Sequence, residues 1–318
     1  MAKFDLRGIF PPLITPLSTD GEIDVASLKR LVRFLLDGGV DGLWVLGATG
    51  QFYTLSERQR DVVTDTVVEE ANGEVPILIG CIDSSPDRSI ARGKRAMASG
   101  ANGIFATAPI FDSVTQVELF SHFRQIRESV DLPLVAYNAV YATQTPFAVD
   151  TVVRLAEEGT LAGIKDSADF PEFRRLLVEL RHLPEFRIVT GHAYLADVAF
   201  MIGAVGCVPT LANLIPATYA NIRRAADRGD WVSARKLQEE AVILDRIVRC
   251  WEPQISVFGN FFGAAKTVLR LLGVIDCSNP GHPYPCPTAE QESRVHAELL
   301  RLGMLTREAV LSSPDGAR

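Results

Sequence analysis

A lysine at the end of a short apolar segment is the side chain in this sequence that points most directly to chemistry. The segment Leu161–Lys165 precedes Asp166, and Lys165 is one of six lysines that stand beside 26 arginines. A residue that only has to be positive can be arginine, whereas a lysine at the end of a buried strand can lose its proton and attack a carbonyl carbon. Taken alone, the same lysine could end a strand in solvent or pair with Asp166.

A second reactive side chain, Tyr137, ends the apolar segment Leu134–Tyr137, 28 residues before Lys165. If the two segments are neighbouring parallel strands joined by one helix, their ends lie at the same edge of the sheet. Burial would then lower the pKa of Lys165, and the phenol beside it could carry protons to and from an adduct. Taken alone, Tyr137 could also be a core aromatic with a satisfied hydroxyl.

The elements that must position these residues follow a repeated pattern of apolar segment, turn and amphipathic segment, which is typical of a strand followed by a helix. Eight such pairs are expected: Ile9–Thr15 with Asp24–Leu36, Gly42–Leu46 with Ser56–Ala71, Pro76–Gly80 with Asp87–Ser99, Gly103–Ala106 with Gln116–Val130, Leu134–Tyr137 with Ala148–Glu158, Leu161–Lys165 with Pro171–Leu180, Arg187–Thr190 with Tyr194–Ile202, and Val205–Pro209 with Pro216–Arg228. Near-continuous apolar strands that alternate with helices predict an α/β fold with a parallel sheet, and eight units close into a (β/α)8 TIM barrel. An open doubly wound sheet is the alternative, but no glycine-rich phosphate fingerprint follows the first strand.

A short motif supports the count of units. Gly-x-x-Gly recurs at Gly39–Gly42, Gly100–Gly103 and Gly203–Gly206, each time between a helix end and an apolar strand. The first glycine suits a left-handed position after the helix, and the second lets the strand enter close to its neighbour.

The alternation stops at Arg228, which predicts a barrel domain over residues 1–228 and a C-terminal extension of three helices over residues 229–318. The helices are expected at Trp231–Cys250, Phe261–Leu272 and Thr288–Leu302, with a proline-rich link over Asn279–Pro287 between the last two. We expect Ser312–Arg318 to fray.

Candidate site residues follow the ends of the predicted strands, because the site of such a barrel lies at that face. They are Gly47, Ala48, Thr49 and Gln51 after the second strand, Cys81 after the third, Gly191 and His192 after the seventh, and Asn213 after the eighth. The Gly47–Gln51 loop offers backbone amides before a helical segment and suits a carboxylate, although such turns are also common as structure alone. His192 could bind a substrate hydroxyl, transfer a proton or make only structural hydrogen bonds. Trp44 and Phe52 are expected to pack.

Composition excludes several other classes of protein. The 318 residues are 47% hydrophobic with a net charge of −7 and no long block of one sign, so we expect no nucleic-acid partner. No apolar run approaches the roughly 20 residues of a membrane helix, and the N-terminus lacks an apolar signal core, so we expect a soluble cytoplasmic protein. The five cysteines, without metal-like spacing, predict free thiols and no metal site.

Four motifs together resemble the dihydrodipicolinate synthase and N-acetylneuraminate lyase family of class I, Schiff-base-forming aldolases, from about Gly8 to Leu302. They are Ile14-Thr15-Pro16, Gly47-Ala48-Thr49-Gly50-Gln51, Tyr137-Asn138 and Gly163-Ile164-Lys165-Asp166-Ser167. The resemblance implies that Lys165 condenses with the ketone of pyruvate or another 2-oxo acid, that Tyr137 carries protons, and that Thr49 with loop amides holds the carboxylate. It also implies a homotetramer and no cofactor, since the protonated imine is the electron sink.

The sequence departs from the family pattern at five positions. Ala48 and Phe111 stand where dihydrodipicolinate synthases have two relay hydroxyls, the second on a tyrosine that reaches into the neighbouring subunit. Gln51 replaces a glutamate of the family pattern, and Val140 replaces a proline. Ala142 replaces the arginine that, in dihydrodipicolinate synthases, binds the carboxylate of the semialdehyde substrate. Loss of such a charge-assisted hydrogen bond costs about 1.5–3 kcal/mol, so we do not expect a true dihydrodipicolinate synthase. Phe111 is kept as a candidate for contact with the substrate.

Two functions of different classes fit these residues. The first is a lyase that forms an imine with pyruvate or a 2-keto-3-deoxy sugar acid and then cleaves, condenses or dehydrates it. The second is a binding or regulatory protein that keeps the barrel and the lysine but has lost turnover. Turnover on a keto-deoxy acid separates the two.

Overall fold

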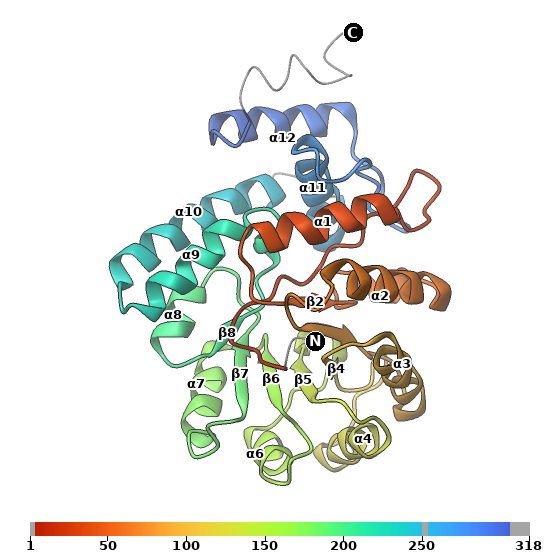
Figure 1. The fold of residues 1–318 in the computed structure, drawn as a ribbon, viewed down its shortest axis with the longest axis vertical. Coiled ribbons are helices and arrows are strands. Elements are labelled where there is room, and N and C mark those ends of the chain that lie inside the picture. The colour runs from red at the N-terminus through yellow and green to blue at the C-terminus, as the bar shows by residue number, and fades with distance from the viewer. Residues whose placement is uncertain (1–3, 250–253, 306–318) are drawn as a thin grey trace.

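The computed structural model describes residues 4–249 and 254–305, and its eight strands form one parallel sheet in the order β1-β8-β7-β6-β5-β4-β3-β2 (Figure 1). The strands are β1 Gly8–Ile9, β2 Leu43–Val45, β3 Ile77–Gly80, β4 Gly103–Ala106, β5 Leu134–Asn138, β6 Gly163–Asp166, β7 Arg187–Thr190 and β8 Gly206–Cys207. The helices are α1 Val25–Asp37, α2 Glu57–Ala71, α3 Pro86–Ser99, α4 Gln116–Ser129, α5 Val140–Thr143, α6 Val149–Glu157, α7 Phe170–Glu179, α8 Ala196–Met201, α9 Pro216–Asp227, α10 Trp231–Arg249, α11 Val257–Leu271 and α12 Ala289–Arg301. Two 3-10 turns, η1 Phe52–Thr54 and η2 Thr210–Asn213, follow β2 and β8.

The two edges of the sheet meet at the segment that follows β1. Pro12 and Trp44 form a parallel bridge, and the Leu13 N–H donates to the Trp44 carbonyl at 2.9 Å. The Trp44 N–H in turn donates to the Pro11 carbonyl at 3.1 Å. The sheet therefore closes into a barrel with the helices outside it, and the predicted (β/α)8 fold is confirmed.

The first strand is much shorter than predicted. The expected Ile9–Thr15 reduces to Gly8–Ile9, because Pro11 and Pro12 have no N–H to donate to a ladder. The segment nevertheless stays in the barrel wall, since the Phe10 N–H donates to the Cys207 carbonyl at 2.9 Å. The eighth strand is likewise shortened to Gly206–Cys207, and the other six lie within two residues of their predicted bounds.

The repeated glycines have the geometry that the motif predicts. The first glycine of each motif has a positive φ, with values of 79° at Gly39, 91° at Gly100 and 107° at Gly203. At Gly42, a Cβ would lie only 2.0 Å from Cε1 of Phe10, so this strand enters against its neighbour only without a side chain.

Local capping explains where several helices begin. The Ser56 side chain accepts from the Gln59 N–H, and the Gln59 side chain accepts from the Ser56 N–H. Thr115 and Glu118 make the same reciprocal pair before α4. Each box satisfies two of the donors that a helix start leaves open.

Of the three helices beyond α9, α10 packs on α8 and α9 of the barrel, α11 packs on α10, and α12 packs on α11. The Tyr194 hydroxyl, before α8, donates to Asp245 of α10 at 2.5 Å. The proline-rich link between α11 and α12 returns to the barrel, where the Gln51 amide donates to the Pro280 carbonyl at 2.6 Å. The division at Arg228 stays a prediction, and Cys250 and Ser312–Arg318 lie outside the described residues.

Two further expectations concern the described ranges alone. Within 4–249 and 254–305, no helix combines the length and apolar character needed to cross a membrane. Cys81, Cys207, Cys277 and Cys286 are free thiols, as predicted.

Candidate active site

Lys165 and Tyr137 lie side by side on neighbouring strands. They are register partners in the β5–β6 pair, so their side chains point to the same face of the sheet. The Nζ atom of Lys165 lies 3.9 Å from the centre of the Tyr137 ring, and only 5% of Lys165 is exposed. The predicted meeting of these two strand ends is confirmed.

Aromatic rings from neighbouring strands lie around the Lys165 amine. Trp44 of β2 lies 5.2 Å from Lys165 Nζ and stacks on Phe105 of β4 at 3.9 Å between ring centres. The rings of Trp44 and Tyr137 are nearly perpendicular, with their centres 6.1 Å apart. Trp44 packs, as expected, but it also faces the amine, which its position in the middle of a predicted strand did not reveal.

The surroundings of Lys165 favour its neutral form. Burial lowers the pKa of its ammonium group to about 7, because an apolar environment disfavours the charged form. The alternative ion pair with Asp166 is absent, since Oδ1 of Asp166 accepts from Asn138 Nδ2 and the Ala168 N–H, both at 2.9 Å. Successive strand residues point to opposite faces, which separates Asp166 from the amine. A neutral lysine amine can act as a nucleophile.

Tyr137 is hydrogen-bonded to a residue that sequence analysis missed. Its hydroxyl lies 2.6 Å from the hydroxyl of Tyr141, on the four-residue helix α5. Burial raises the pKa of Tyr137 well above its ordinary value, and Tyr141 adds to the effect. Tyr141 is 54% exposed, and its ring lies 6.1 Å from Phe258 of α11. The two phenols therefore connect the buried amine with the surface.

The Gly47–Gln51 loop is held at its C-terminal end by two other segments of the chain. The Thr15 hydroxyl donates to the Gly50 carbonyl at 2.8 Å, and Gln51 has a φ of 56°. Because the Gln51 amide is bound to Pro280, this side chain fixes the loop to the C-terminal link. Thr49 is buried and Ala48 half-buried, both following the strand that carries Trp44.

The turn after β7 comes close to the lysine. A Cβ at Gly191 would lie 2.0 Å from Oγ of Ser167 and 3.0 Å from Cε of Lys165, so only glycine leaves room there. His192 Nε2 lies 2.6 Å from the Ala168 carbonyl, which can only accept, so Nε2 carries a hydrogen. His192 therefore borders the loop that follows Lys165.

Three other predicted site residues are placed differently. Cys81 is fully buried and its pKa is raised to about 12, so its thiol is protonated near neutral pH. Asn213 uses its side chain within the fold: Oδ1 accepts from the Ile14 N–H, and Nδ2 donates to the Pro12 and Thr210 carbonyls. Phe111 is 96% exposed with a φ of 90°. Asn213 is thus a structural residue, and Phe111 is not buried beside Lys165 within this chain.

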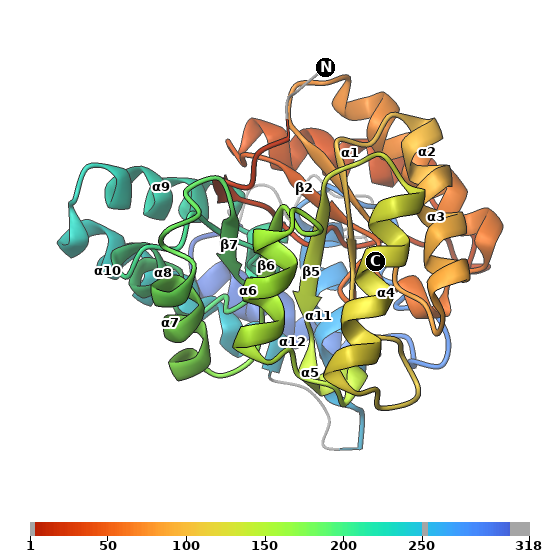
Figure 2. The ribbon, with the colours of Figure 1, turned by 90° about the horizontal axis from the view of Figure 1, so that it is seen from below.

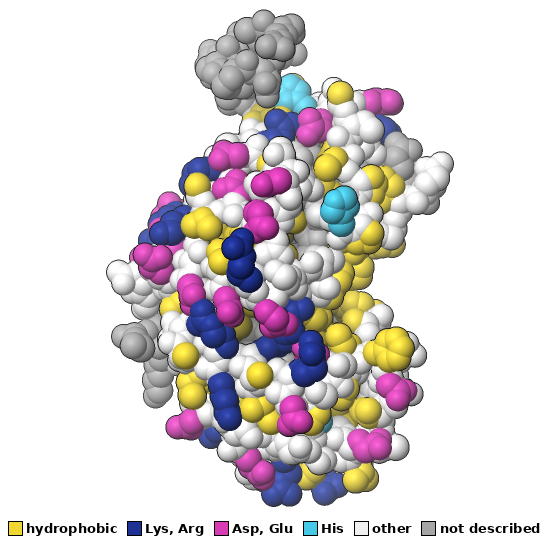
Figure 3. All heavy atoms as spheres, turned by 90° about the vertical axis from the view of Figure 1, so that its right-hand side faces the viewer, with side chains coloured by type: hydrophobic (Ala, Val, Ile, Leu, Met, Phe, Trp, Pro, Cys, Tyr) yellow, Lys and Arg dark blue, Asp and Glu magenta, His cyan; other side chains and the backbone are white. Residues whose placement is uncertain are grey.

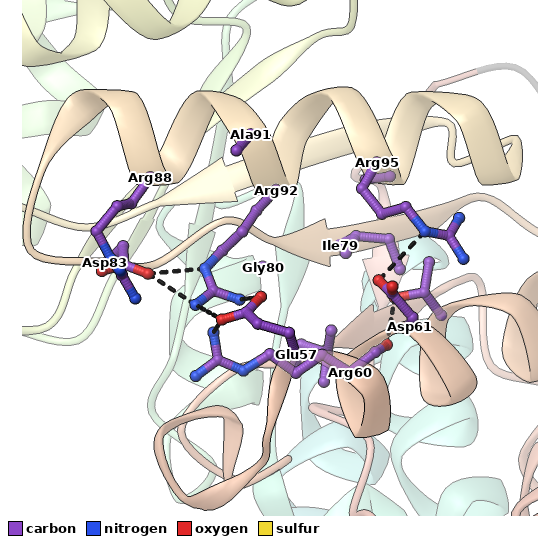
Figure 4. Close-up of a pocket in the computed structure, with 13 residues that line it drawn as sticks. Glu57, Arg60, Asp61, Ile79, Gly80, Asp83, Arg88, Ala91, Arg92 and Arg95 are labelled. Carbon is purple, nitrogen blue, oxygen red and sulfur yellow. Dashed lines mark hydrogen bonds and ion pairs between the residues drawn. The ribbon is translucent and has the colours of Figure 1, made fainter.

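A cavity of about 440 Å³ lies elsewhere, between α2 and α3 (Figure 4). Arg92 binds Asp83 and also donates to both oxygens of Glu57, at 2.6 and 2.8 Å. Acidic and basic side chains are interspersed over the adjoining face (Figure 3). The lining arginine and carboxylate side chains in Figure 4 are joined by ion pairs, and the candidate lysine chemistry does not use them. In the described residues, no three His, Cys, Asp or Glu side chains gather as metal ligands.

The fold and this site define a (β/α)8-barrel protein with a buried lysine at the carboxyl end of a barrel strand. Residues 5–301 match the Dihydrodipicolinate synthetase family, and the chain belongs to that family.

Individual relatives carry different names within this class. The chain is 30% identical to a 4-hydroxy-tetrahydrodipicolinate synthase of Rhodopseudomonas palustris, over 92% of this chain and 97% of the relative. It is 29% identical to a probable 2-dehydro-3-deoxy-D-pentonate aldolase of Escherichia coli, over 96% and 99%. The solved structure of dihydrodipicolinate synthase from Bacteroides thetaiotaomicron superposes with a TM-score of 0.88 at 28% identity, covering 94% of this chain and all of that one.

Proposed function

We propose that this protein is a lyase that forms an imine between Lys165 and the keto carbon of pyruvate or a 2-keto-3-deoxy acid. The observation that carries the proposal is the buried Lys165 amine beside Tyr137, with a pKa lowered to about 7. At neutral pH about half of such an amine is unprotonated and able to attack. Relatives named as a synthase and as an aldolase support the same class of reaction.

The chemistry follows from the amine and the phenol. The nitrogen of Lys165 adds to the keto carbon, the former carbonyl oxygen takes up protons and leaves as water, and a protonated imine remains. In an aldol cleavage, the bond between C3 and C4 breaks and its electrons enter the imine, while the C4 hydroxyl loses its proton and becomes an aldehyde. In a dehydration, C3 loses a proton and C4 loses hydroxide. The proposed role of Tyr137 is to carry these protons.

The Gly47–Gln51 loop is the proposed carboxylate site. Thr49 and the backbone amides around it follow the strand that carries Trp44, and backbone N–H groups of such a turn bind anions well. Ala48 leaves space where a larger side chain would stand, and Gly191 and His192 border the variable part of the substrate. We also propose a homotetramer in the cytoplasm, in keeping with the family resemblance.

Borohydride trapping tests the proposal. The protein is incubated with pyruvate or a set of 2-keto-3-deoxy sugar acids, reduced, digested and mapped by mass. We expect a mass gain on the peptide that contains Lys165. Lys266 of α11 is an internal control, because it is fully buried with a pKa also lowered to about 7, but its amine donates to the Asn279 carbonyl at 2.9 Å.

The comparison of the two lysines shows whether a buried lysine with a lowered pKa is enough for adduct formation or whether the Lys165 site is required. A mass gain on Lys165 and none on Lys266 supports the proposal, whereas no adduct with any ligand in the folded protein refutes it. An adduct without cleavage or water loss on any keto-deoxy acid would instead favour the binding or regulatory protein.

A further inference from the structure

We propose that Tyr141 is a positioning residue that holds the Tyr137 hydroxyl and exchanges its proton with solvent. This inference rests on the proposed function, because it assigns a route to the protons that imine formation and breakdown require. It concerns a residue outside the motifs that suggested the function.

The geometry joins one buried and one exposed phenol. Tyr137 is 4% exposed, so its hydroxyl cannot trade protons freely with water. Tyr141 is half exposed as a whole residue, although burial around its hydroxyl raises the pKa of that group. The Tyr141 hydroxyl lies 2.6 Å from that of Tyr137, within the range of a good O–H···O hydrogen bond. One hydrogen bond therefore joins the buried Tyr137 hydroxyl to a residue that reaches the protein surface.

Three aromatic contacts hold the two rings of this pair. The Tyr137 ring is held edge-on to Trp44 and Phe105, at 6.1 and 6.3 Å. The Tyr141 ring lies 6.1 Å from Phe258, which in turn stacks on Phe262 at 5.9 Å. Figure 2 shows α5 and α11 on the side of the barrel toward which β5 runs. The C-terminal helices thus support the outer phenol.

The proton balance is simple. Tyr137 gives its proton to the departing hydroxyl of the carbinolamine, its oxygen takes the proton of Tyr141, and Tyr141 takes one from water. In the reverse direction each proton moves the other way, and both phenols end as they began. Ala48 has no hydroxyl, and Phe111 has none and is 96% exposed, so neither can pass a proton to Tyr137 within this chain.

Tyr141→Phe tests the inference, because it keeps the ring against Phe258 and removes only the hydroxyl. We expect the rate of pyruvate trapping on Lys165 to fall about tenfold, less than the roughly 10²–10⁴-fold contributed by a group that itself transfers the proton to substrate, because Tyr137 stays in place. We also expect the variant to become dependent on buffer concentration, since small buffer acids can replace the missing donor, while the parent stays independent of it. Tyr141→His, which can relay a proton through its imidazole, should recover part of the rate.

Tyr53→Phe is the matched control. Tyr53 is also partly exposed and also shares a hydrogen bond with another phenol, the Tyr284 hydroxyl at 2.8 Å. Its loss should leave the trapping rate and its buffer dependence unchanged.

Several results would overturn the inference. If the parent traps pyruvate on Lys165 and Tyr141→Phe does so at the same rate without buffer dependence, the inference fails while the proposed function stands. The same holds if Ser167→Ala, which removes a second hydroxyl that interacts with Tyr137, reproduces the buffer effect and Tyr141→Phe does not. If the parent traps nothing, the proposed function fails and the inference with it.

Discussion

Lys165 lies against two aromatic faces instead of a carboxylate, and these neighbours decide its charge. A carboxylate would stabilise the ammonium form and raise its pKa. Aromatic faces attract a cation by only about 0.5–2 kcal/mol, which is less than burial of the charge costs. The balance therefore lowers the pKa of Lys165, in agreement with its 5% exposure.

This charge balance predicts the pH dependence of imine formation. The neutral amine is the reactive form, so the trapping rate with pyruvate should rise with pH through about 7 and level off about one unit above it. At pH 6, about a tenth of the plateau rate is expected. Trapping rates between pH 5.5 and 9 check this, and a rate that still rises with pH at pH 9, without a plateau, would mean that the lysine keeps its ordinary pKa.

At the residue scale, the sequence could identify Lys165 and Tyr137 but not their full surroundings. Both end apolar segments, and strand ends meet in a barrel whatever the details of the loops. Tyr141 could not be found in this way, because its contact depends on a four-residue helix with no periodic signal. The structural role of Asn213 depends on a segment almost 200 positions away, which sequence pattern alone does not connect.

At the scale of elements, the barrel is closed by side-chain bonds as well as by strands. The segment after β1 carries two prolines and forms few ladder bonds, so Asn213 supplies the missing partners for Ile14 and Pro12. This explains why a strand predicted from its apolar residues can be two residues long while the barrel remains closed.

Asn213→Ala should accordingly destabilise the protein. It would leave a buried N–H and a buried carbonyl without this partner, at a cost of about 2–4 kcal/mol in the free energy of unfolding. Urea denaturation measures the change. Asn221→Ala is the control, because Asn221 is exposed and accepts only from the neighbouring Arg224 at 3.0 Å. Equal stability of the two variants would contradict this role.

The element boundaries were predictable mainly where caps or glycines mark them. Helix α2 begins at Glu57, one residue after its predicted start at Ser56, which caps it, whereas α11 begins at Val257, four residues before its predicted start. Ser256 accepts from the Gly259 N–H and is the cap that the prediction overlooked.

At the scale of the whole molecule, the C-terminal helices are part of the candidate site's support. Phe258 of α11 lies against Tyr141, and Pro280 of the link holds Gln51. The predicted division at Arg228 would thus separate Lys165 from the residues that hold Tyr141 and the Gly47–Gln51 loop. A barrel cut at that point would keep Lys165 but lose both supports.

The buried lysine also makes the stability of the whole molecule depend on pH. Its pKa is about 7 in the folded state and near 10.5 when unfolded, so the unfolded state binds more protons between these values and stability rises with pH. Relative to Lys165→Met, the parent should gain up to roughly 1.4 kcal/mol per pH unit. Chemical denaturation of both proteins at pH 7.5, 8.25 and 9 measures this difference, and parallel curves would contradict it.

Trp44 has a use beyond packing, because it is one of three tryptophans in the sequence and its ring lies 5.2 Å from Lys165 Nζ. Indole emission responds to the electric field across the ring, and a full charge at this distance is a strong local field. Protonation of the amine, or its conversion to a charged imine, changes that field. We therefore expect the emission of Trp44 to report protonation of Lys165 and its conversion to an imine, without any attached label.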